Sequence, residues 1–142
     1  MALSSPVHIR SSQEMAIESE DDVLQVRREV RVLAERLGFN PFATAAVTTA
    51  TSELARNIWC HAGRGMVQIE VIDEEGRSGL RLVFRDQGPG IPDIERVLVG
   101  GYSTARSLGL GLSGSRRLVD EFNLQSQPGQ GTVVTVVKWG RL

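Results

Sequence analysis

Lysine is almost absent from this sequence of 142 residues: Lys138 is the only lysine among 16 basic residues, and all the others are arginine. P-loop nucleotide-binding proteins and protein kinases of the eukaryotic type both place a lysine against the phosphates of their nucleotide. Lys138 lies near the C-terminal end and follows no glycine-rich loop. Both of these phosphate sites are therefore excluded.

Cysteine is scarce as well, with Cys60 alone in the sequence. A single cysteine excludes a framework of disulfide bonds and fits a reducing compartment. Cys60 could be a nucleophile, but we expect it to be a small buried hydrophobic side chain. No stretch approaches the roughly 20 apolar residues that cross a bilayer, and the first residues lack the layout of a signal peptide. We therefore expect a cytoplasmic protein with no membrane partner.

The sequence also lacks an excess of charge of either sign, because its net charge is only -1. Such a balance gives no reason to expect a nucleic-acid partner. Hydrophobic residues make up 41% of the sequence and charged residues 23%, which is normal for a soluble globular protein. The length suits a single domain over residues 1–142, with enough chain to bury a core.

The periodicity of apolar residues predicts an α+β fold. Ser19 and Asn40-Pro41 are helix-start signals, and Gly38 is a helix stop. Apolar residues that alternate with polar ones predict strands. We expect strands in residues 7–19, 67–71, 80–84, 122–126 and 132–139, a turn at 73–79, and helices in 19–38, 40–61, 93–99 and 111–121. This order favours a two-layer sandwich, with helices on one face of a mixed, largely antiparallel sheet.

Two polar residues one helical turn apart form the first candidate site. Glu53 and Asn57 are four residues apart on the second expected helix, so their side chains share one face. A carboxylate and an amide oxygen in this arrangement can hold a hydrated magnesium ion or orient a hydroxyl group. An ordinary solvated helix face has the same spacing, and the pair alone does not separate the two interpretations.

Glycine is concentrated in the second and third candidate sites, since seven of the 15 glycines lie between Gly88 and Gly114. Asp86 ends a strand and is followed by Gln87-Gly88-Pro89-Gly90. Its carboxylate could accept a hydrogen bond from an exocyclic amine such as that of adenine. The glycines have no Cβ, so a flat ring could approach the backbone closely. An ordinary turn would use the same residues. The segment from Gly109 to Gly114 opens an expected helix. The free backbone N–H groups and the positive end of the dipole at a helix start suit the binding of an anion. A dinucleotide fold fails because the segment follows a loop and position 129 is glycine.

In this order the three segments resemble the boxes of the GHKL (Bergerat-fold) ATPases. Glu53 to Asn57 resembles the N box, Asp86 to Gly90 the first glycine box, and Gly109-Leu110-Gly111-Leu112 the second. Gly131-Thr132 resembles the strand start that supports the adenine pocket. The resemblance covers nearly the whole chain. The runs SELARNI, DQGPGIPDIE and GLGLSGSRRLVDEF are most similar to the anti-sigma-factor kinases, in particular the switch kinases of the bacterial stressosome.

This resemblance implies a use for each segment. It makes Glu53 the general base, Asn57 the ligand of Mg2+, and Asp86 the residue that reads the adenine of ATP. Residues 91–108 would form an ATP lid. The further nucleotide-binding residues that it implies are Gly88, Gly90, Gly101 as a hinge, Arg106 at the terminal phosphate, Gly109, Leu110, Gly111, Leu112 and Thr132.

The family implies a protein-serine/threonine kinase whose substrate is a STAS-domain antagonist, and whose release activates a downstream phosphatase or sigma-pathway regulator. Two other functions stay open: an anti-sigma factor that binds a sigma subunit directly, and a nucleotide-gated binding module without kinase activity. A histidine kinase would need a phosphoacceptor histidine on a separate helix, and neither His8 nor His61 has that setting.

Overall fold

The computed structural model describes residues 6–88 and 106–140, and of residues 106–111 it describes the backbone alone. The described elements, in chain order, are β1 (His8–Ile17), α1 (Glu20–Arg36), α2 (Pro41–Asn57), the π-helix η1 (Ile58–Ala62), β2 (Gly65–Glu74), β3 (Arg77–Asp86), α4 (Arg106–Leu118), β4 (Glu121–Ser126) and β5 (Thr132–Trp139). None of the described helices has the length and apolar character needed to cross a membrane.

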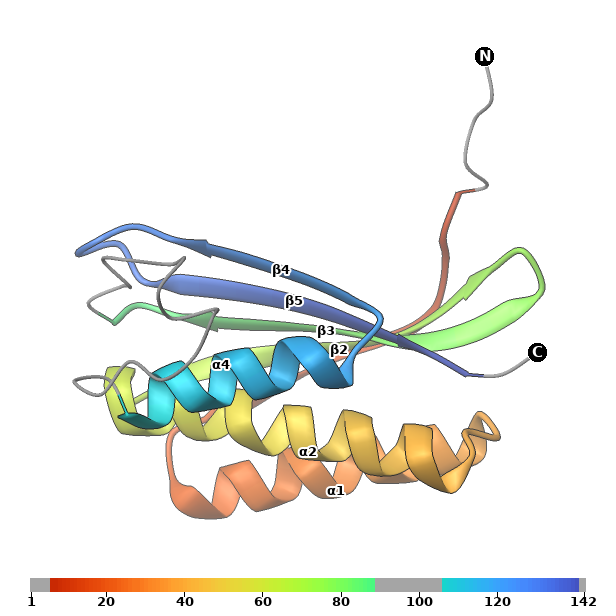
Figure 1. Cartoon of the computed structure of the whole chain (residues 1–142), viewed down its shortest axis with the longest axis horizontal. Helices are drawn as coiled ribbons and strands as arrows, with labels where there is room; N and C mark the ends of the chain where they lie inside the picture. The colour runs from red at the N-terminus through yellow and green to blue at the C-terminus, as the bar shows by residue number, and fades with distance from the viewer. Residues whose placement is uncertain (1–5, 89–105, 141–142) are drawn as a thin grey trace.

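The strands form one five-stranded sheet in the order β1-β2-β3-β5-β4, and the helices α1, α2 and α4 lie together on one face of it (Figure 1). Each described pair of neighbouring strands is antiparallel. The predicted α+β two-layer sandwich is confirmed, and its described sheet is more uniform than the mixed arrangement expected.

The core lies between the helices and the inner face of the sheet. Alternate residues of the central strands face the helices, and α1 and α2 each contribute an apolar stripe at helical spacing. The side chains that share this core are Val23, Val26 and Val30 of α1, Val47, Leu54 and Ile58 of α2 and η1, Val67, Ile69 and Val71 of β2, and Leu80, Leu82 and Phe84 of β3.

The two long helices begin at the residues that the sequence predicts. Ser19 caps α1 by accepting a hydrogen bond from the backbone N–H of Asp22 at 3.1 Å. The carboxylate of Asp22 reaches back to the backbone N–H of Glu18 at 2.9 Å. Asn40 caps α2 through a 2.7 Å hydrogen bond from the backbone N–H of Ala43, with Pro41 in the first helical turn. These caps satisfy N–H groups that a helix start leaves unpaired.

The β2–β3 turn is shorter than the sequence suggested. It consists of Glu75 and Gly76, which have φ values of 51° and 81°, so the strands extend through residues expected to lie in the turn. Two central residues with positive φ match the right-handed twist of a hairpin. The prediction of a turn over residues 73–79 was wrong in extent because Asp73 and Glu74 pair with Ser78 and Arg77 as parts of the two strands.

The last helix also differs from its expected bounds. α4 begins at Arg106 rather than near Gly111. It ends at Leu118 rather than at residue 121, since Glu121 is already the first residue of β4. The glycines that suggested a helix start lie inside its early turns, where glycine is tolerated at a cost. The helix expected over residues 93–99 lies outside the described residues.

Cys60 is exposed, so the expectation that it is a buried hydrophobic residue was wrong. It lies on η1, and the wider turn of a π-helix changes the face on which successive residues fall. Ile58 is the last residue of the apolar stripe that remains buried, and Trp59 and His61 are exposed beside Cys60.

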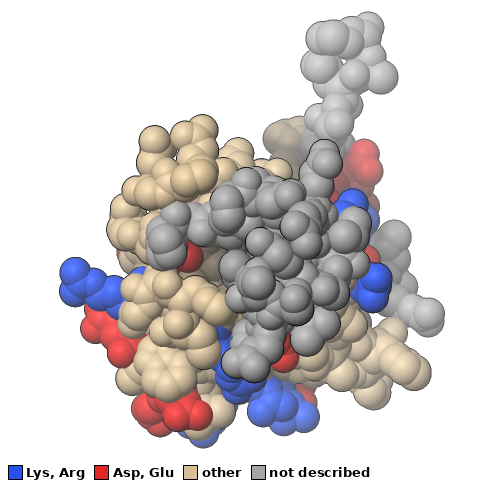
Figure 2. Space-filling model, turned by 60° about the vertical axis from the view of Figure 1, so that its left-hand side comes forward, with Lys and Arg blue, Asp and Glu red and all other residues tan. Residues whose placement is uncertain are grey.

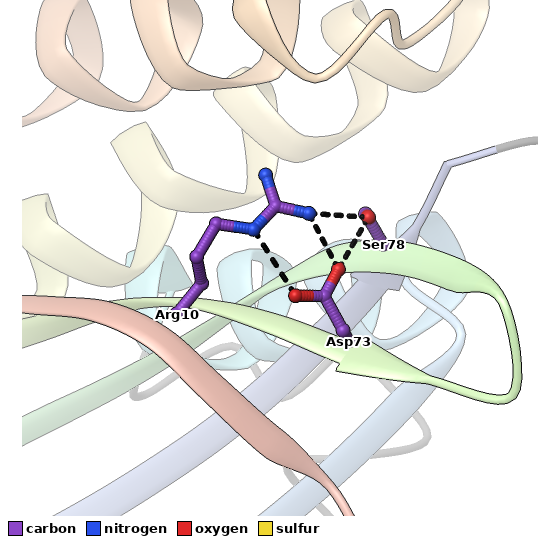
Figure 3. Close-up of polar contacts among 3 residues, drawn as sticks. All are labelled: Arg10, Asp73 and Ser78. Atoms are coloured by element: carbon purple, nitrogen blue, oxygen red, sulfur yellow. Dashed lines mark hydrogen bonds and ion pairs between the residues drawn. The ribbon is translucent and has the colours of Figure 1, made fainter.

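A polar cluster fastens the edge strand β1 to the β2–β3 hairpin (Figure 3). Arg10 lies where the β1–β2 register shifts, between Ile9 and Ser11. Its guanidinium group donates to both carboxylate oxygens of Asp73, at 2.6 and 3.1 Å, and to the hydroxyl of Ser78 at 2.9 Å. The hydrogen bond from Arg10, and then that from Ser78, hold the pKa of Asp73 below its usual range.

We expect Asp73→Asn to lower stability at neutral pH but not in strong acid. A carboxylate with a lowered folded-state pKa stabilises the fold above the unfolded value of about 3.9, and this contribution is lost as pH falls through the folded pKa. Urea unfolding at several pH values should show the gap between wild type and Asp73→Asn closing in acid. Glu14→Gln, at an exposed carboxylate of β1, is the control. A gap that stays constant with pH would contradict this role.

Candidate active site

The C-terminal end of α2 carries the first pair of candidate residues. Glu53 is half-buried, and within the described part of the chain its carboxylate has no hydrogen-bond or ion-pair partner. Asn57, one turn later, is 8% exposed, and its amide nitrogen Nδ2 is buried without a partner among the described residues. A buried amide group without a partner is costly, by about 1–3 kcal/mol, unless something else bonds to it. Among the described residues, the pair therefore offers one carboxylate and one amide group that are both without a partner.

The π-helix η1 continues α2 and turns the chain toward the end of β3. Its geometry shows in the hydrogen bond from the backbone N–H of Gly63 to the carbonyl of Ile58, five residues earlier, at 3.0 Å. η1 packs against β3. A Cβ added at Gly88 would lie 2.7 Å from the Cβ of Ala62, so glycine is what allows this approach. Sequence periodicity missed η1, since the expected helix simply ran on to His61.

Asp86 ends β3 beside this junction. Its carboxylate oxygen Oδ1 accepts a hydrogen bond from the backbone N–H of Gly88 at 2.8 Å. Burial raises the pKa of Asp86, against the opposing effects of the hydrogen bonds from the Gly88 and Thr132 backbone and of the charge of His61. A half-buried carboxylate that is fixed in this way can still accept a hydrogen bond from an amine.

The start of β5 supports Asp86 from the other side. Thr132 is paired with Asp86 across the strands, and its hydroxyl lies 2.9 Å from that of Ser126. The hydroxyl of Ser126 also donates to the carbonyl of Gly131 at 3.0 Å. Gly131 has a φ of +82°, and a Cβ there would lie 2.2 Å from the carbonyl oxygen of Asp86. Ser126 had no signal in the sequence, whereas Thr132 was predicted.

α4 packs against α2 and carries the second glycine segment. Gly109, Leu110 and Gly111 lie within its early turns, and the side chains of residues 106–111 are outside the described set, including that of Arg106. Leu112 is 1% exposed and belongs to the hydrophobic core. The Leu112 side chain therefore packs in the core. Gly90 and Gly101 lie outside the described residues.

The described residues could hold a metal ion only if a bound ligand supplied further oxygen atoms. No group of three or more histidine, cysteine or carboxylate side chains gathers in the described part of the chain to hold a metal ion. Magnesium is commonly held by one or two protein oxygens, several waters and the phosphates of a substrate. The unpartnered amide of Asn57 fits that pattern, because rotating the amide by 180° presents Oδ1 in place of Nδ2.

Charges of both signs are interspersed over the described surface at this end of the molecule. Figure 2 shows Lys and Arg side chains among Asp and Glu side chains rather than one extended patch of either sign. This agrees with the net charge of -1. An anionic ligand would therefore be held by local backbone groups and single side chains, and not by a broad electrostatic field.

Comparisons with known proteins show similarity to one family over most of the chain. Residues 17–138 match the family model of the histidine kinase-like ATPase domain. The chain is 47% identical to the serine/threonine-protein kinase RsbT of Bacillus subtilis (strain 168), over 88% of this chain and 94% of that protein. It is 33% identical to an anti-sigma F factor of Geobacillus stearothermophilus, over 65% of this chain and 66% of that protein. Its fold is like that in the crystal structure of the SiaB-SiaC complex from Pseudomonas aeruginosa, with a TM-score of 0.56, 15% identity, and 92% and 90% of the two chains covered.

We expect Asp86→Asn to weaken ATP binding without destabilising the nucleotide-free protein. A hydrogen bond to a charged group contributes about 1.5–3 kcal/mol, so its loss should raise the Kd by about tenfold or more. The raised pKa means that the ionised carboxylate costs stability once pH rises through the folded pKa, and the amide removes this cost. Thermal unfolding with and without ATP would measure both effects. A clearly lower Tm for nucleotide-free Asp86→Asn would contradict this interpretation.

A pair of glycine substitutions tests the backbone approach at Asp86. Gly129 and Gly131 both have positive φ, but a Cβ at Gly129 would meet nothing within 4 Å. Gly129→Ala should cost about 1–2 kcal/mol from backbone conformation alone. Gly131→Ala should cost more, and should also weaken ATP binding, because the new methyl group displaces the Asp86 carbonyl. Denaturant unfolding and ATP titration measure the difference, and equal losses in the two variants would refute it.

Proposed function

The chain belongs to the histidine kinase-like ATPase domain family and is a serine/threonine-protein kinase of the RsbT type, and from that premise we propose that it phosphorylates a STAS-domain antagonist and then changes partners. The observation that carries the proposal is the Glu53 carboxylate one turn before the Asn57 amide, neither of which has a partner among the described residues, on the helix that leads through η1 to Asp86. In this proposal residues 1–142 act as one domain.

ATP would lie at the end of the sheet where β3 and β5 meet α2 and η1. Asp86 reads the exocyclic amine of adenine, and Thr132 and Gly88 hold the carboxylate in place through their backbone N–H groups. Gly109, Leu110 and Gly111 of α4 are proposed to form the phosphate side of the site, with Leu112 packed in the core behind them. Gly90, Gly101 and Arg106 are proposed to belong to the same site.

Asn57 would hold a magnesium ion together with the phosphates and water. This ion, when bound, neutralises charge on the phosphate oxygens. The fit rests on an amide that is nearly buried and lacks a partner among the described residues. In the absence of the ion, the same amide can donate to a phosphate oxygen, because its nitrogen carries two hydrogens.

Glu53 would be the general base of the transfer. Its carboxylate accepts the proton of a serine or threonine hydroxyl of the substrate, the hydroxyl oxygen forms a bond to the terminal phosphorus of ATP, and ADP leaves. Phosphoryl transfer depends mainly on positioning and on neutralising charge. A base within hydrogen-bond reach of the acceptor contributes about 10²–10⁴ in rate.

Phosphorylation of the antagonist would release the kinase, which then binds and activates a downstream phosphatase of a bacterial stress-response or sigma-factor pathway. The similarity to the serine/threonine-protein kinase RsbT supports the kinase step of this proposal. The anti-sigma F factors support a second function, in which the chain binds a sigma subunit directly. Their lower identity and coverage favour the first.

We expect Glu53→Ala to abolish phosphate transfer while ATP still binds. Labelled phosphate transfer from Mg-ATP to a STAS-domain antagonist of the same genome measures the first property, and ATP titration measures the second. The expected rate loss is about 10²–10⁴-fold. Glu35→Ala, at an exposed carboxylate of α1, is the matched control and should transfer phosphate normally.

Two results would count against the assignments. Equal loss of ATP binding and transfer in Glu53→Ala would remove the base role. Absence of transfer by the wild type, with ATP binding intact, would favour the binding function or show that another protein is the substrate.

A further inference from the structure

A phenylalanine projects into solvent at the start of α2. Phe42 is 88% exposed, the largest exposed fraction among the described large hydrophobic side chains. It follows Asn40 and Pro41, and the Asn40 side chain caps the helix through Ala43 at 2.7 Å. Its backbone is therefore rigidly held. Exposed aromatic side chains on ordered backbone are typical anchors of protein–protein contacts, because they bury a large area at little cost in entropy.

A groove of about 390 Å³ lies against this side chain. Three elements meet around it: the start of α2, the end of α4 and the end of β5. Its lining is largely apolar, with two charged residues at the rim, and includes Phe42, Ala43, Ala46, Arg117, Leu118 and Trp139. An apolar floor beside an exposed aromatic residue suits an apolar side chain from another molecule.

Among the residues that the structure describes, the charges at the groove leave one cation, Arg117, without a counter-ion. The carboxylate of Asp120 lies 3.4 Å from the Nζ of Lys138 and accepts from the backbone N–H of Trp139 at 2.7 Å. The carboxylate of Glu121 accepts from the indole N–H of Trp139 at 3.1 Å. Arg117 is exposed and has no hydrogen-bond or ion-pair partner within residues 6–88 and 106–140. The nearby acids are thus engaged, and the free positive charge calls for a carboxylate from outside.

The groove is remote from the candidate active site. Phe42 and Asn57 lie at opposite ends of α2, about 22 Å apart at 1.5 Å per residue. In Figure 1, η1 lies at one end of the helix layer and the start of α2 at the other. A serine or threonine in contact with Glu53 therefore does not occupy this groove.

We propose that the groove docks an acidic amphipathic helix of a partner protein. An apolar side chain of that helix packs on Phe42 and Leu118, and a carboxylate one turn away pairs with Arg117. A helix fits because its i, i+3 and i+4 positions place apolar and charged groups side by side. This surface goes beyond the phosphate-transfer site, since none of its residues takes part in nucleotide binding or in the transfer.

The test uses the full chain and two labelled synthetic helical peptides of about five turns. Both carry phenylalanine and leucine on one face; one has flanking glutamates, and the other has lysines in their place. Fluorescence anisotropy should show preferential binding of the glutamate peptide. Phe42→Ser and Arg117→Glu should each weaken that binding by about tenfold, and Arg117→Glu should improve binding of the lysine peptide.

Matched controls come from α1. Leu24, 48% exposed, and the exposed Arg31 lie away from the groove, so Leu24→Ser and Arg31→Glu should leave the affinity unchanged. All four variants should bind ATP and transfer phosphate like the wild type, which separates this proposal from the proposed function.

Three outcomes would overturn the proposal. Equal affinity of the wild type for the two peptides would remove the charge argument. A loss in Leu24→Ser as large as that in Phe42→Ser would remove the argument from location. A dimer seen by sedimentation that Phe42→Ser dissociates would show that a second copy of this chain occupies the groove instead.

Discussion

The close approach of three backbone segments around Asp86 is the constraint on which the candidate site depends. The register pairs Asp86 with Gly65 on one side and with Thr132 on the other. A Cβ at Gly65 would lie 2.3 Å from the carbonyl oxygen of Arg85, and one at Gly131 would lie 2.2 Å from that of Asp86. Glycine is required at both positions because any side chain would push the strands apart. With the strands in place, the N–H groups that hold the Asp86 carboxylate follow from the backbone.

At this end of the molecule, the free-energy cost of poorly satisfied polar groups is offset by the burial of apolar side chains in the adjacent core. The unpartnered amide of Asn57 and the raised pKa of Asp86 both mark groups that the fold holds in unfavourable surroundings. Each buried unpaired polar group costs about 1–3 kcal/mol. A fully buried Val, Leu or Phe side chain contributes about 1.5–3 kcal/mol, and residues next to the site residues in sequence, such as Leu54 and Phe84, are of this kind. The burial of such side chains can therefore offset the free-energy cost of these polar groups.

Much of the fold could be predicted because local rules determine it. The caps at Ser19 and Asn40 and the apolar stripes of α1 and α2 follow from spacing, and the structure confirms them. Contacts between segments far apart in the sequence determine the features that could not be predicted. The turn at Glu75-Gly76 is short because cross-strand pairing extends the strands through polar residues. η1 could not be read from the sequence, because a π-turn has the composition of an α-helix and depends on packing against β3. Of the site, the assignment of Asp86 and Thr132 to one pocket came only from the family resemblance, and the contact between them was not predicted.

The two ends of α2 differ in how well their polar groups are satisfied, and this difference separates two kinds of binding. At the start of the helix, Asn40 satisfies a backbone N–H, so the surface there has few polar demands and presents Phe42. At the end, Asn57 remains without a partner among the described residues, and Glu53 keeps a free carboxylate. A satisfied, apolar end suits the side chains of a protein, whereas an unsatisfied polar end suits phosphate, a cation or a hydroxyl group. In the two proposals above, one helix would keep a protein-docking surface and a phosphate-transfer site apart, because neither end offers what the ligand of the other end needs.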